Sequence, residues 1–212
     1  MAVVAVIDSG GGNIGSVRYA LERLGARSIL TVDPATIASA DRVILPGVGA
    51  AAPAMAKLRE LDLVATIRRL QQPLLGICLG MQLLYESSEE GEVECLGLLP
   101  GRITQLQPGP GVRVPHMGWN LLQKHEPASA DRSLSDHSFA ASLLAGIGER
   151  DQAYFVHSYA APLSSDTLAS ASHGTRFTAV AGRGRVFGAQ FHPERSAAVG
   201  SRLLANFLAL EA

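Results

Sequence analysis

Cysteine is nearly absent from this 212-residue chain, which contains only Cys78 and Cys95. Neither cysteine belongs to a Cys-x-x-Cys pair or to a His/Cys cluster with metal-ligand spacing, so we expect no metal site and no cofactor. The opening residues lack the basic segment and the cleavage-like segment of a signal peptide. We therefore expect reduced thiols and a cytoplasmic location rather than a disulfide.

Charged side chains are also scarce, at 17% of the sequence, and 18 Lys and Arg nearly balance 19 Asp and Glu. The absence of a Lys/Arg cluster argues against nucleic acid or an anionic membrane as a partner. No apolar run approaches the roughly 18 residues of a membrane span. With 47% hydrophobic residues, the chain can bury one large core, which predicts a single domain over residues 1–212.

The first hundred residues alternate between apolar runs and amphipathic stretches. Strands are predicted at residues 3–7, 28–32, 42–45 and 74–77. A helix is predicted from Asn13 to a cap at Gly25, and a helical turn within 34–40. Residues 53–70 are predicted to form one helix, or two with a break near Asp62. This alternation predicts an α/β fold with a mostly parallel central sheet and flanking helices, in which ligands bind at the carboxyl ends of the strands.

The second half of the chain changes to short strands, which predict a smaller antiparallel region. They are expected at residues 102–106, 112–117, 153–157, 167–171, 177–181 and 186–190. A hairpin turn at residues 182–184 would join the last two. Residues 123–150 are expected to form a surface loop with one helix near 139–144, and residues 196–210 a closing helix that packs on the core.

Two glycine-rich loops follow predicted strands. Gly10, Gly12 and Gly15 only partly match a dinucleotide-binding loop, so a tight turn or a loop that faces a partner is the better interpretation than a nucleotide site. The Pro-Gly-Val-Gly segment at residues 46–49 suggests a backbone that exposes its N–H groups or changes conformation, although an ordinary turn fits the same residues.

The stretch PLLGICLGMQLLYE, residues 73–86, combines a buried strand, a tight turn and an amphipathic helix. Gly76 and Gly80 flank Cys78 at the spacing of a nucleophile elbow, in which glycines permit a sharp turn and close packing. The thiol would then lie at a helix N-terminus, where the dipole favours a thiolate and N–H groups can bind an oxyanion. The alternative is that Cys78 is a small buried hydrophobic residue.

A nucleophilic thiol needs a base, and the base needs a group that orients it. His192 ends a predicted strand, and Pro193 after it fixes the backbone so that Glu194 can turn back toward the imidazole. His157 and His116 are chemically possible bases, but neither has an acidic neighbour in the sequence. The remaining histidines lie in polar segments and are expected to be solvated: His125, His137 and His173.

The motifs PLLGICLGMQLL, PGVG and QFHPE together resemble those of class I triad glutamine amidotransferases, which have a flavodoxin-like fold. Within that family, the segments VPHMGWN at residues 114–120, YFVHSY at 154–159 and the opening IDSGGGN are similar to glutaminase subunits of imidazole glycerol phosphate synthase. The resemblance covers the chain except for residues 123–150.

The resemblance implies a role for individual residues in glutamine hydrolysis. Cys78 would be the nucleophile, His192 the general base and acid, and Glu194 the group that orients His192. Matching oxyanion-hole positions are Val48, Gly49 and Leu79. Matching positions for L-glutamine are Gly47, Gly49, Gln82, His157, Ser158 and Tyr159.

The resemblance also implies a partner, a cyclase subunit with a (β/α)8 barrel that receives ammonia and makes imidazole glycerol phosphate and an aminoimidazole carboxamide ribonucleotide. Asn13, Trp119 and Arg195 match positions that face this partner; Arg195 replaces the lysine common there, so the charge is kept but the geometry differs. The alternatives are a glutaminase subunit for another synthase, such as pyridoxal phosphate synthase, or a non-catalytic regulatory homologue.

Overall fold

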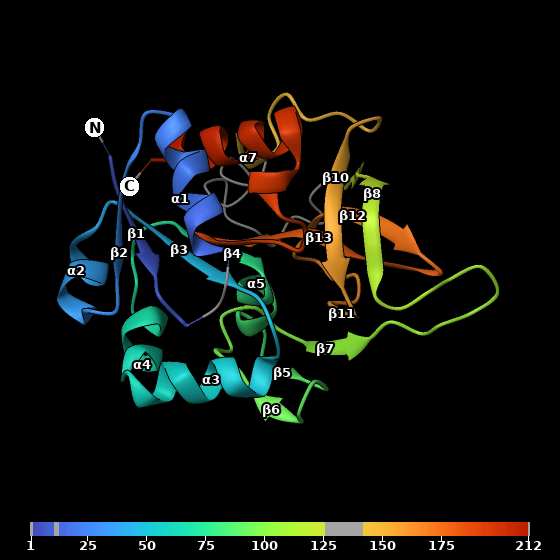
Figure 1. Cartoon of the computed structure of the whole chain (residues 1–212), viewed down its shortest axis with the longest axis horizontal. Coiled ribbons are helices and arrows are strands. Elements are labelled where there is room, and N and C mark those ends of the chain that lie inside the picture. Colours follow the sequence, from blue (N-terminus) through green and yellow to red (C-terminus); the bar gives the residue numbers. More distant parts are fainter. Residues whose placement is uncertain (1, 11–12, 126–141, 212) are drawn as a thin grey trace.

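A central eight-stranded sheet organises the fold of the computed structural model, which describes residues 2–10, 13–125 and 142–211 (Figure 1). Its strands, in spatial order, are β2 (Arg27–Thr31), β1 (Val3–Ile7), β3 (Arg42–Gly47), β4 (Leu74–Cys78), β14 (Val186–Ala189), β13 (Thr175–Arg183), β12 (Thr167–His173) and β9 (Gln123–Lys124). The first five are parallel and the rest antiparallel. The predicted mostly parallel α/β sheet is confirmed.

The inner parallel strands β1, β3 and β4 are mostly buried and apolar, since helices cover both faces of the sheet there. Successive side chains of β1 alternate between two cores, with Val4 and Val6 in one and Ala5 and Ile7 in the other. One core lies under α1 (Ile14–Arg23) and α7 (Ala197–Ala209). The other lies under α2 (Pro34–Ser39), α3 (Ala51–Glu60), α4 (Leu63–Arg68) and α5 (Leu79–Leu83).

The helix boundaries follow local chemistry at the predicted positions. Gly25 adopts a φ of +75° just after α1, and Asp62, at a φ of +54°, separates α3 from α4. The Asp33 side chain accepts a hydrogen bond from the N–H of Thr36 at 2.8 Å, which caps α2. The predicted helical turn at 34–40 is thus a short helix, and the predicted break near Asp62 is confirmed.

Two small sheets pack beside the central one in the second half of the chain. One pairs β8 (His116–Leu121) with β10 (Gln152–His157), and the other has the order β11 (Tyr159–Ala160), β7 (Arg102–Gln105), β5 (Ser87–Ser88), β6 (Val93–Glu94). Figure 1 shows β8 and β10 side by side at one end of the central sheet. The predicted smaller antiparallel region is therefore present.

Three predicted boundaries in this region are wrong. The strand expected at 112–117 begins only at His116, because Pro115 cannot donate to a ladder and Val112 closes a turn with Gly109. The last hairpin turns after Arg183, which still pairs with Val186. The expected loop from residue 123 starts with strand β9, and most of that loop and the first half of the helix expected at 139–144 lie outside the described residues.

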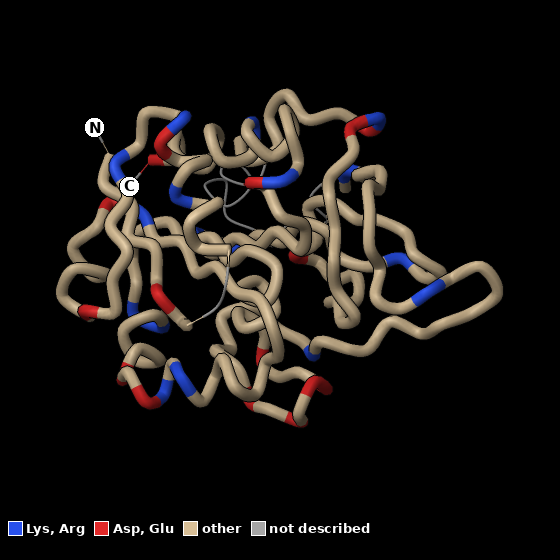
Figure 2. The backbone as a smooth tube through the Cα atoms, viewed as in Figure 1, with Lys and Arg blue, Asp and Glu red and all other residues tan. Residues whose placement is uncertain are grey.

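Figure 2 shows Lys and Arg interspersed with Asp and Glu along the described backbone. Within the same residues, no helix is both long enough and apolar enough to cross a membrane.

Candidate functional site

The turn between β4 and α5 presents Cys78 in a strained conformation, with φ of 54° and ψ of −112°. A Cβ atom on Gly80 would lie 1.8 Å from the carbonyl oxygen of Leu45, and one on Gly76 would lie 2.6 Å from the carbonyl oxygen of Gly80. Glycine is therefore required on both sides of the cysteine, because α5 packs directly against β3 and β4. The geometry is that of the predicted elbow.

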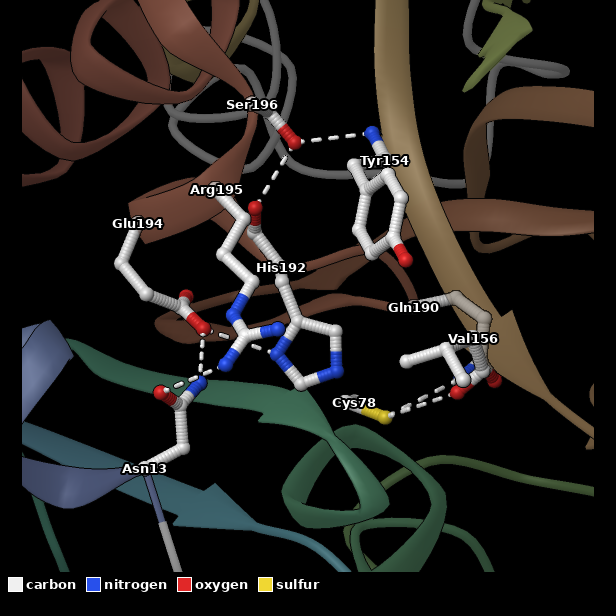
Figure 3. A network of polar contacts seen from close by, with 9 residues as sticks. All are labelled: Asn13, Cys78, Tyr154, Val156, Gln190, His192, Glu194, Arg195 and Ser196. Atoms are coloured by element: carbon white, nitrogen blue, oxygen red, sulfur yellow. Dashed lines mark hydrogen bonds and ion pairs between the residues drawn. The ribbon is translucent and has the colours of Figure 1, made fainter. Parts of the chain in front are cut away.

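His192 comes to this elbow from the neighbouring strand. β14 pairs in parallel with β4, so the residues after Ala189 leave the sheet at the same edge as Cys78. The backbone N–H of His192 donates to the carbonyl of Tyr154 at 3.0 Å. The Ser196 hydroxyl donates to the His192 carbonyl at 2.7 Å and accepts from the N–H of Tyr154 at 2.9 Å, which fixes the histidine backbone (Figure 3).

Glu194 orients the His192 ring. Its Oε1 lies 2.8 Å from Nδ1 of His192, and the two side chains are 0% and 4% exposed. Because a carboxylate only accepts, Nδ1 carries the proton, and Figure 3 shows the other ring nitrogen turned toward the Cys78 sulfur. Although burial lowers the pKa of His192, the adjacent Cys78 sulfur and Glu194 carboxylate raise it to about 10.

The Cys78 sulfur itself is nearly buried, with 7% of the residue exposed. It lies 3.8 Å from the carbonyl oxygen of Val156 and 3.9 Å from Nε2 of Gln190. A protonated imidazole stabilises negative charge on a neighbouring sulfur. The elbow can therefore combine a nucleophile, a proton acceptor and an orienting carboxylate.

A cavity of about 270 Å³ opens over the sulfur. Its lining includes most of the residues predicted for the oxyanion hole and the substrate: Val48, Gly49, Leu79, Gln82, His157, Ser158 and Tyr159. Gly47 does not line it; it pairs with Cys78 in the sheet and borders a smaller cavity instead. A Cβ on Gly47 would lie 2.9 Å from the backbone nitrogen of Gly80, so its contribution is close packing.

Two backbone segments that line the cavity can offer N–H groups. Gly49 has a φ of +95°, a conformation that side chains rarely adopt. Leu79 is the first residue of α5, and first-turn N–H groups have no acceptor within their own helix. The structure thus brings Val48, Gly49 and Leu79 to the same cavity.

Glu90 also lines this cavity, although sequence reasoning did not single it out. Its Oε2 accepts the N–H of Ala51 at 2.8 Å, which holds the carboxylate in place. In the sequence, Glu90 lies within an acidic run of ordinary appearance. Only the fold shows that this one carboxylate faces the cavity.

The other histidines are not solvated bases. The ring of His157 is held by Tyr159 and His116, and burial lowers the pKa of both histidines, to about 3 for His157 and about 4 for His116. His125 and His173, which were expected to be solvated, are half-buried and each has a partner. His125 Nε2 lies 2.8 Å from the Ser170 hydroxyl, and the His173 ring stacks on His116 at 4.2 Å. Their partners are on distant strands; His137 lies outside the described residues.

The three residues predicted to face a partner differ in their surroundings. Trp119 is 52% exposed, between Met117 and Leu121, which share its face of β8 at 64% and 44% exposed. Asn13 instead donates from Nδ2 to Oε1 of Glu194, and exposed Arg195 donates to Oδ1 of Asn13 at 3.5 Å (Figure 3). The link from Asn13 to Glu194 joins residues far apart in the sequence and was not predicted.

Two further sequence expectations concern ligands. Burial raises the pKa of the Cys95 thiol to about 11, as expected of a packing residue. No group of three or more His, Cys, Asp or Glu side chains within the described residues is arranged for a metal ion. Of the first glycine-rich loop, Gly11 and Gly12 are not described.

Comparisons with known proteins find relatives that match nearly the whole chain. The family model for class-I glutamine amidotransferases matches residues 5–210. The chain is 57% identical over 208 residues to the imidazole glycerol phosphate synthase subunit HisH of Xanthomonas axonopodis pv. citri, with 98% of each chain covered. It is 54% identical over 212 residues to the protein of the same name from Xylella fastidiosa strain Temecula1, with both chains fully covered.

Solved structures give the same fold at lower identity. A crystal structure of a glutamine amidotransferase matches with a TM-score of 0.71 and 20% identity, over 97% of this chain and 96% of the other. The crystal structure of a glutamine amidotransferase from Thermotoga maritima matches with a TM-score of 0.60 and 17% identity, over 98% of this chain and 82% of the other.

Proposed function

The chain belongs to the class-I glutamine amidotransferase family, and from this premise we infer that it is the glutaminase subunit of imidazole glycerol phosphate synthase in histidine biosynthesis. The observation that carries this inference is the cavity over Cys78, whose sulfur faces a His192 oriented by Glu194. Full-length identity of 57% to a HisH subunit favours this synthase over pyridoxal phosphate synthase and over a non-catalytic homologue.

The proposed reaction starts at the sulfur of Cys78. The sulfur attacks the side-chain amide carbon of L-glutamine, while His192 holds the thiol proton on Nε2 and returns it to the departing nitrogen, which leaves as ammonia. Water, deprotonated by His192, then attacks the glutamyl thioester, which releases glutamate and restores the thiol. Glu194 keeps Nδ1 protonated and stabilises the imidazolium at both stages.

The negative oxygen of each tetrahedral intermediate needs N–H donors. We assign these to Leu79 at the start of α5 and to the Val48–Gly49 segment, which line the same cavity as the sulfur. Removing one such donor typically costs about 100-fold or more in rate. The positive φ of Gly49 suits a segment whose peptide must aim an N–H inward.

The proposed glutamine site uses the remaining lining of the cavity. Gln82 and the segment 157–159 would hold the substrate, with Gly49 at the rim. The carboxylate of Glu90 supplies the negative charge that an α-ammonium group requires. Gly47 packs closely behind this wall and is not proposed to contact the substrate.

The enzyme acts with a cyclase subunit. We propose that this partner is a (β/α)8 barrel, that it consumes the ammonia to form imidazole glycerol phosphate and an aminoimidazole carboxamide ribonucleotide, and that both act in the cytoplasm. The apolar face of β8 around Trp119, together with Asn13 and Arg195, is the proposed contact surface.

Glutamine hydrolysis, measured with and without the cyclase and its nucleotide ligand, tests this function. We expect the isolated chain to be nearly inactive and the complex to be strongly stimulated, because the 46–49 segment must present an N–H. Full activity of the chain alone would refute the need for the partner. A complex that releases no glutamate from glutamine would refute the function itself.

A further inference from the structure

Two buried histidines lie beside the cavity but take no part in the triad. His116 on β8 lies directly opposite His157 on β10 in the antiparallel pair, and the residues are 4% and 6% exposed. Nδ1 of His116 is 3.1 Å from Nε2 of His157. His157 lines the cavity and His116 does not, so His116 contacts the proposed substrate-binding segment 157–159 from the side away from the cavity.

The direction of each hydrogen bond in this pair follows from its partners. Nδ1 of His157 lies 2.8 Å from the carbonyl oxygen of Tyr159, which only accepts, so this nitrogen carries a proton. A neutral His157 then has an unprotonated Nε2, which must accept from His116. His116 is therefore protonated at Nδ1, and its own Nε2 is free to accept.

Asn120 completes the chain of donors. Its Nδ2 lies 3.2 Å from Nε2 of His116 and donates to the carbonyl of Ser172 at 2.8 Å, while its Oδ1 accepts the N–H of Leu121 at 2.9 Å. These contacts fix the orientation of the amide. Each group therefore donates to the next one: Asn120 to His116, His116 to His157, and His157 to the carbonyl of Tyr159.

Packing keeps the rings in this arrangement. His116 stacks on Phe155 and on His173, with ring centroids 5.0 Å and 4.2 Å apart, and makes a T-shaped contact with Phe177 at a centroid distance of 5.7 Å. Burial lowers the pKa of both His116 and His157, and the nearby His173 adds to this; His192 acts in the same direction on His157. Both rings are neutral at pH 7, as the hydrogen bonds require.

The carbonyl at the end of this chain is shared with the substrate side of the cavity. The oxygen of Tyr159 also accepts from Nε2 of Gln82 at 2.8 Å, and the same nitrogen lies 3.0 Å from Oε1 of Gln190. A shift of His157 would therefore move both the 157–159 wall and Gln82.

We propose that His116 is a positioning residue for glutamine binding, which holds His157 in its Nδ1-protonated neutral form and so fixes the carbonyl of Tyr159. The proposal rests on the proposed function, because it assumes that glutamine occupies this cavity. His116 would act on substrate affinity, while Cys78 and His192 carry the chemistry.

Steady-state glutamine hydrolysis by the complex with the cyclase subunit separates these effects. His116→Phe keeps the stacked ring but removes the donor, so we expect KM for glutamine to rise about tenfold while kcat changes less than about threefold. His116→Asn restores a donor near the position of Nδ1 without the aromatic ring, and its KM should lie within about threefold of the unsubstituted protein. An unchanged KM in His116→Phe, or an equal loss in kcat, would overturn the proposal.

His173→Phe is the matched control, because it preserves a ring stacked on His116 but is not part of the donor chain; its KM should be unchanged. Nitrogen-15 NMR of the histidine rings supplies a readout that needs no activity. We expect His157 to be neutral and protonated at Nδ1 at pH 7, and to lose this preference in His116→Phe. Protonation at Nε2 instead would overturn the proposal, whereas failure of the unsubstituted complex to hydrolyse glutamine would refute only the proposed function.

Discussion

His192 and His157 line the same cavity, and His116 lies directly behind His157, yet the imidazole of His192 and those of the pair His116–His157 are in opposite protonation states. All three are buried, and burial alone lowers the pKa of each. His192 has a carboxylate on one side and a sulfur on the other, and its pKa rises to about 10. The pair has only carbonyl, amide and imidazole partners, and its pKa values fall to about 4 and about 3.

The partner, not the depth of burial, therefore decides what a histidine can do in this protein. A histidine beside anionic groups can hold a proton and exchange it with a nucleophile. A histidine between neutral groups serves as a fixed donor and acceptor in a hydrogen-bond chain. The following substitutions change the partners either of His192 or of the pair His116–His157. The histidines that are not affected serve as the internal reference.

Cys78→Ala should have the largest effect. We expect glutamine hydrolysis by the complex to fall about 10⁴-fold or more, because the nucleophile is lost. NMR titration should also show a lower His192 pKa, since the sulfur no longer stabilises the imidazolium, while His157 is unchanged. Cys95→Ala, in a buried packing site, should retain activity and serves as the control. Residual turnover near that of the control would rule out Cys78 as the nucleophile.

Glu194→Gln replaces the carboxylate partner of His192 by a neutral amide, so His192, like His157, no longer has a carboxylate beside its ring. Without the carboxylate, only the Cys78 sulfur opposes the effect of burial on the pKa of His192, so we expect that pKa to fall and kcat to decrease by at least about 100-fold. The pH dependence of kcat and the ring titration both measure this. Glu92→Gln, whose carboxylate pairs with Arg102 on the surface, is the matched control. A kcat close to that control would contradict the orienting role of Glu194.

Asn13→Ala removes the second donor to Glu194. We expect kcat to fall about tenfold with little change in KM, because the amide contacts the orienting carboxylate rather than the cavity. Asn206→Ala, whose amide donates to the carbonyls of Leu143 and Ala145, is the control. Asn13→Asp should be worse than Asn13→Ala, since it places a second carboxylate beside Glu194; the reverse order would contradict the contact.

The smallest expected effect is on the pH dependence of the free energy of unfolding, which tests the pair His116–His157 directly. Because the folded pKa values of His116 and His157 lie below the ordinary value of 6.5, their contribution is present above pH 6.5 and is lost as the pH falls toward 4. The free energy of unfolding should therefore drop between pH 7.5 and pH 5.5. In His116→Phe that drop should be smaller by about 1 kcal/mol.

Urea unfolding at the two pH values measures this difference. His192 contributes with the opposite sign: its stabilisation is complete below pH 6.5 and is lost only as the pH rises toward 10, so it is common to both proteins. Equal drops in the two proteins would show that His116 titrates normally in the folded state.

Much of the site was predictable because its signals are local. The glycines around Cys78 and the spacing of His192 and Glu194 reflect packing and orientation within a few residues. The parallel sheet followed from alternating apolar runs. The break at Asp62 followed from the change of pattern within one helical stretch.

The remaining features depend on contacts between distant segments. Asn13 reaches Glu194 across 181 residues, and His116 reaches His157 across 41. His173 looks polar in sequence, but stacks on His116 because β12 runs beside β8. The start of β8 was missed because the apolar pattern of residues 112–117 continues through Pro115, where the ladder cannot.

The placement of β14 beside β4 has a consequence for synthesis of the chain on the ribosome. Gln190, whose Nε2 lies 3.9 Å from the Cys78 sulfur, is made 112 residues after Cys78. Until β14 emerges, one side of β4 is an unpaired apolar edge, open to mispairing or to chaperones. The same delay keeps Cys78 apart from His192, so under the proposed mechanism a nascent chain gains glutaminase activity only after its last strand has entered the sheet.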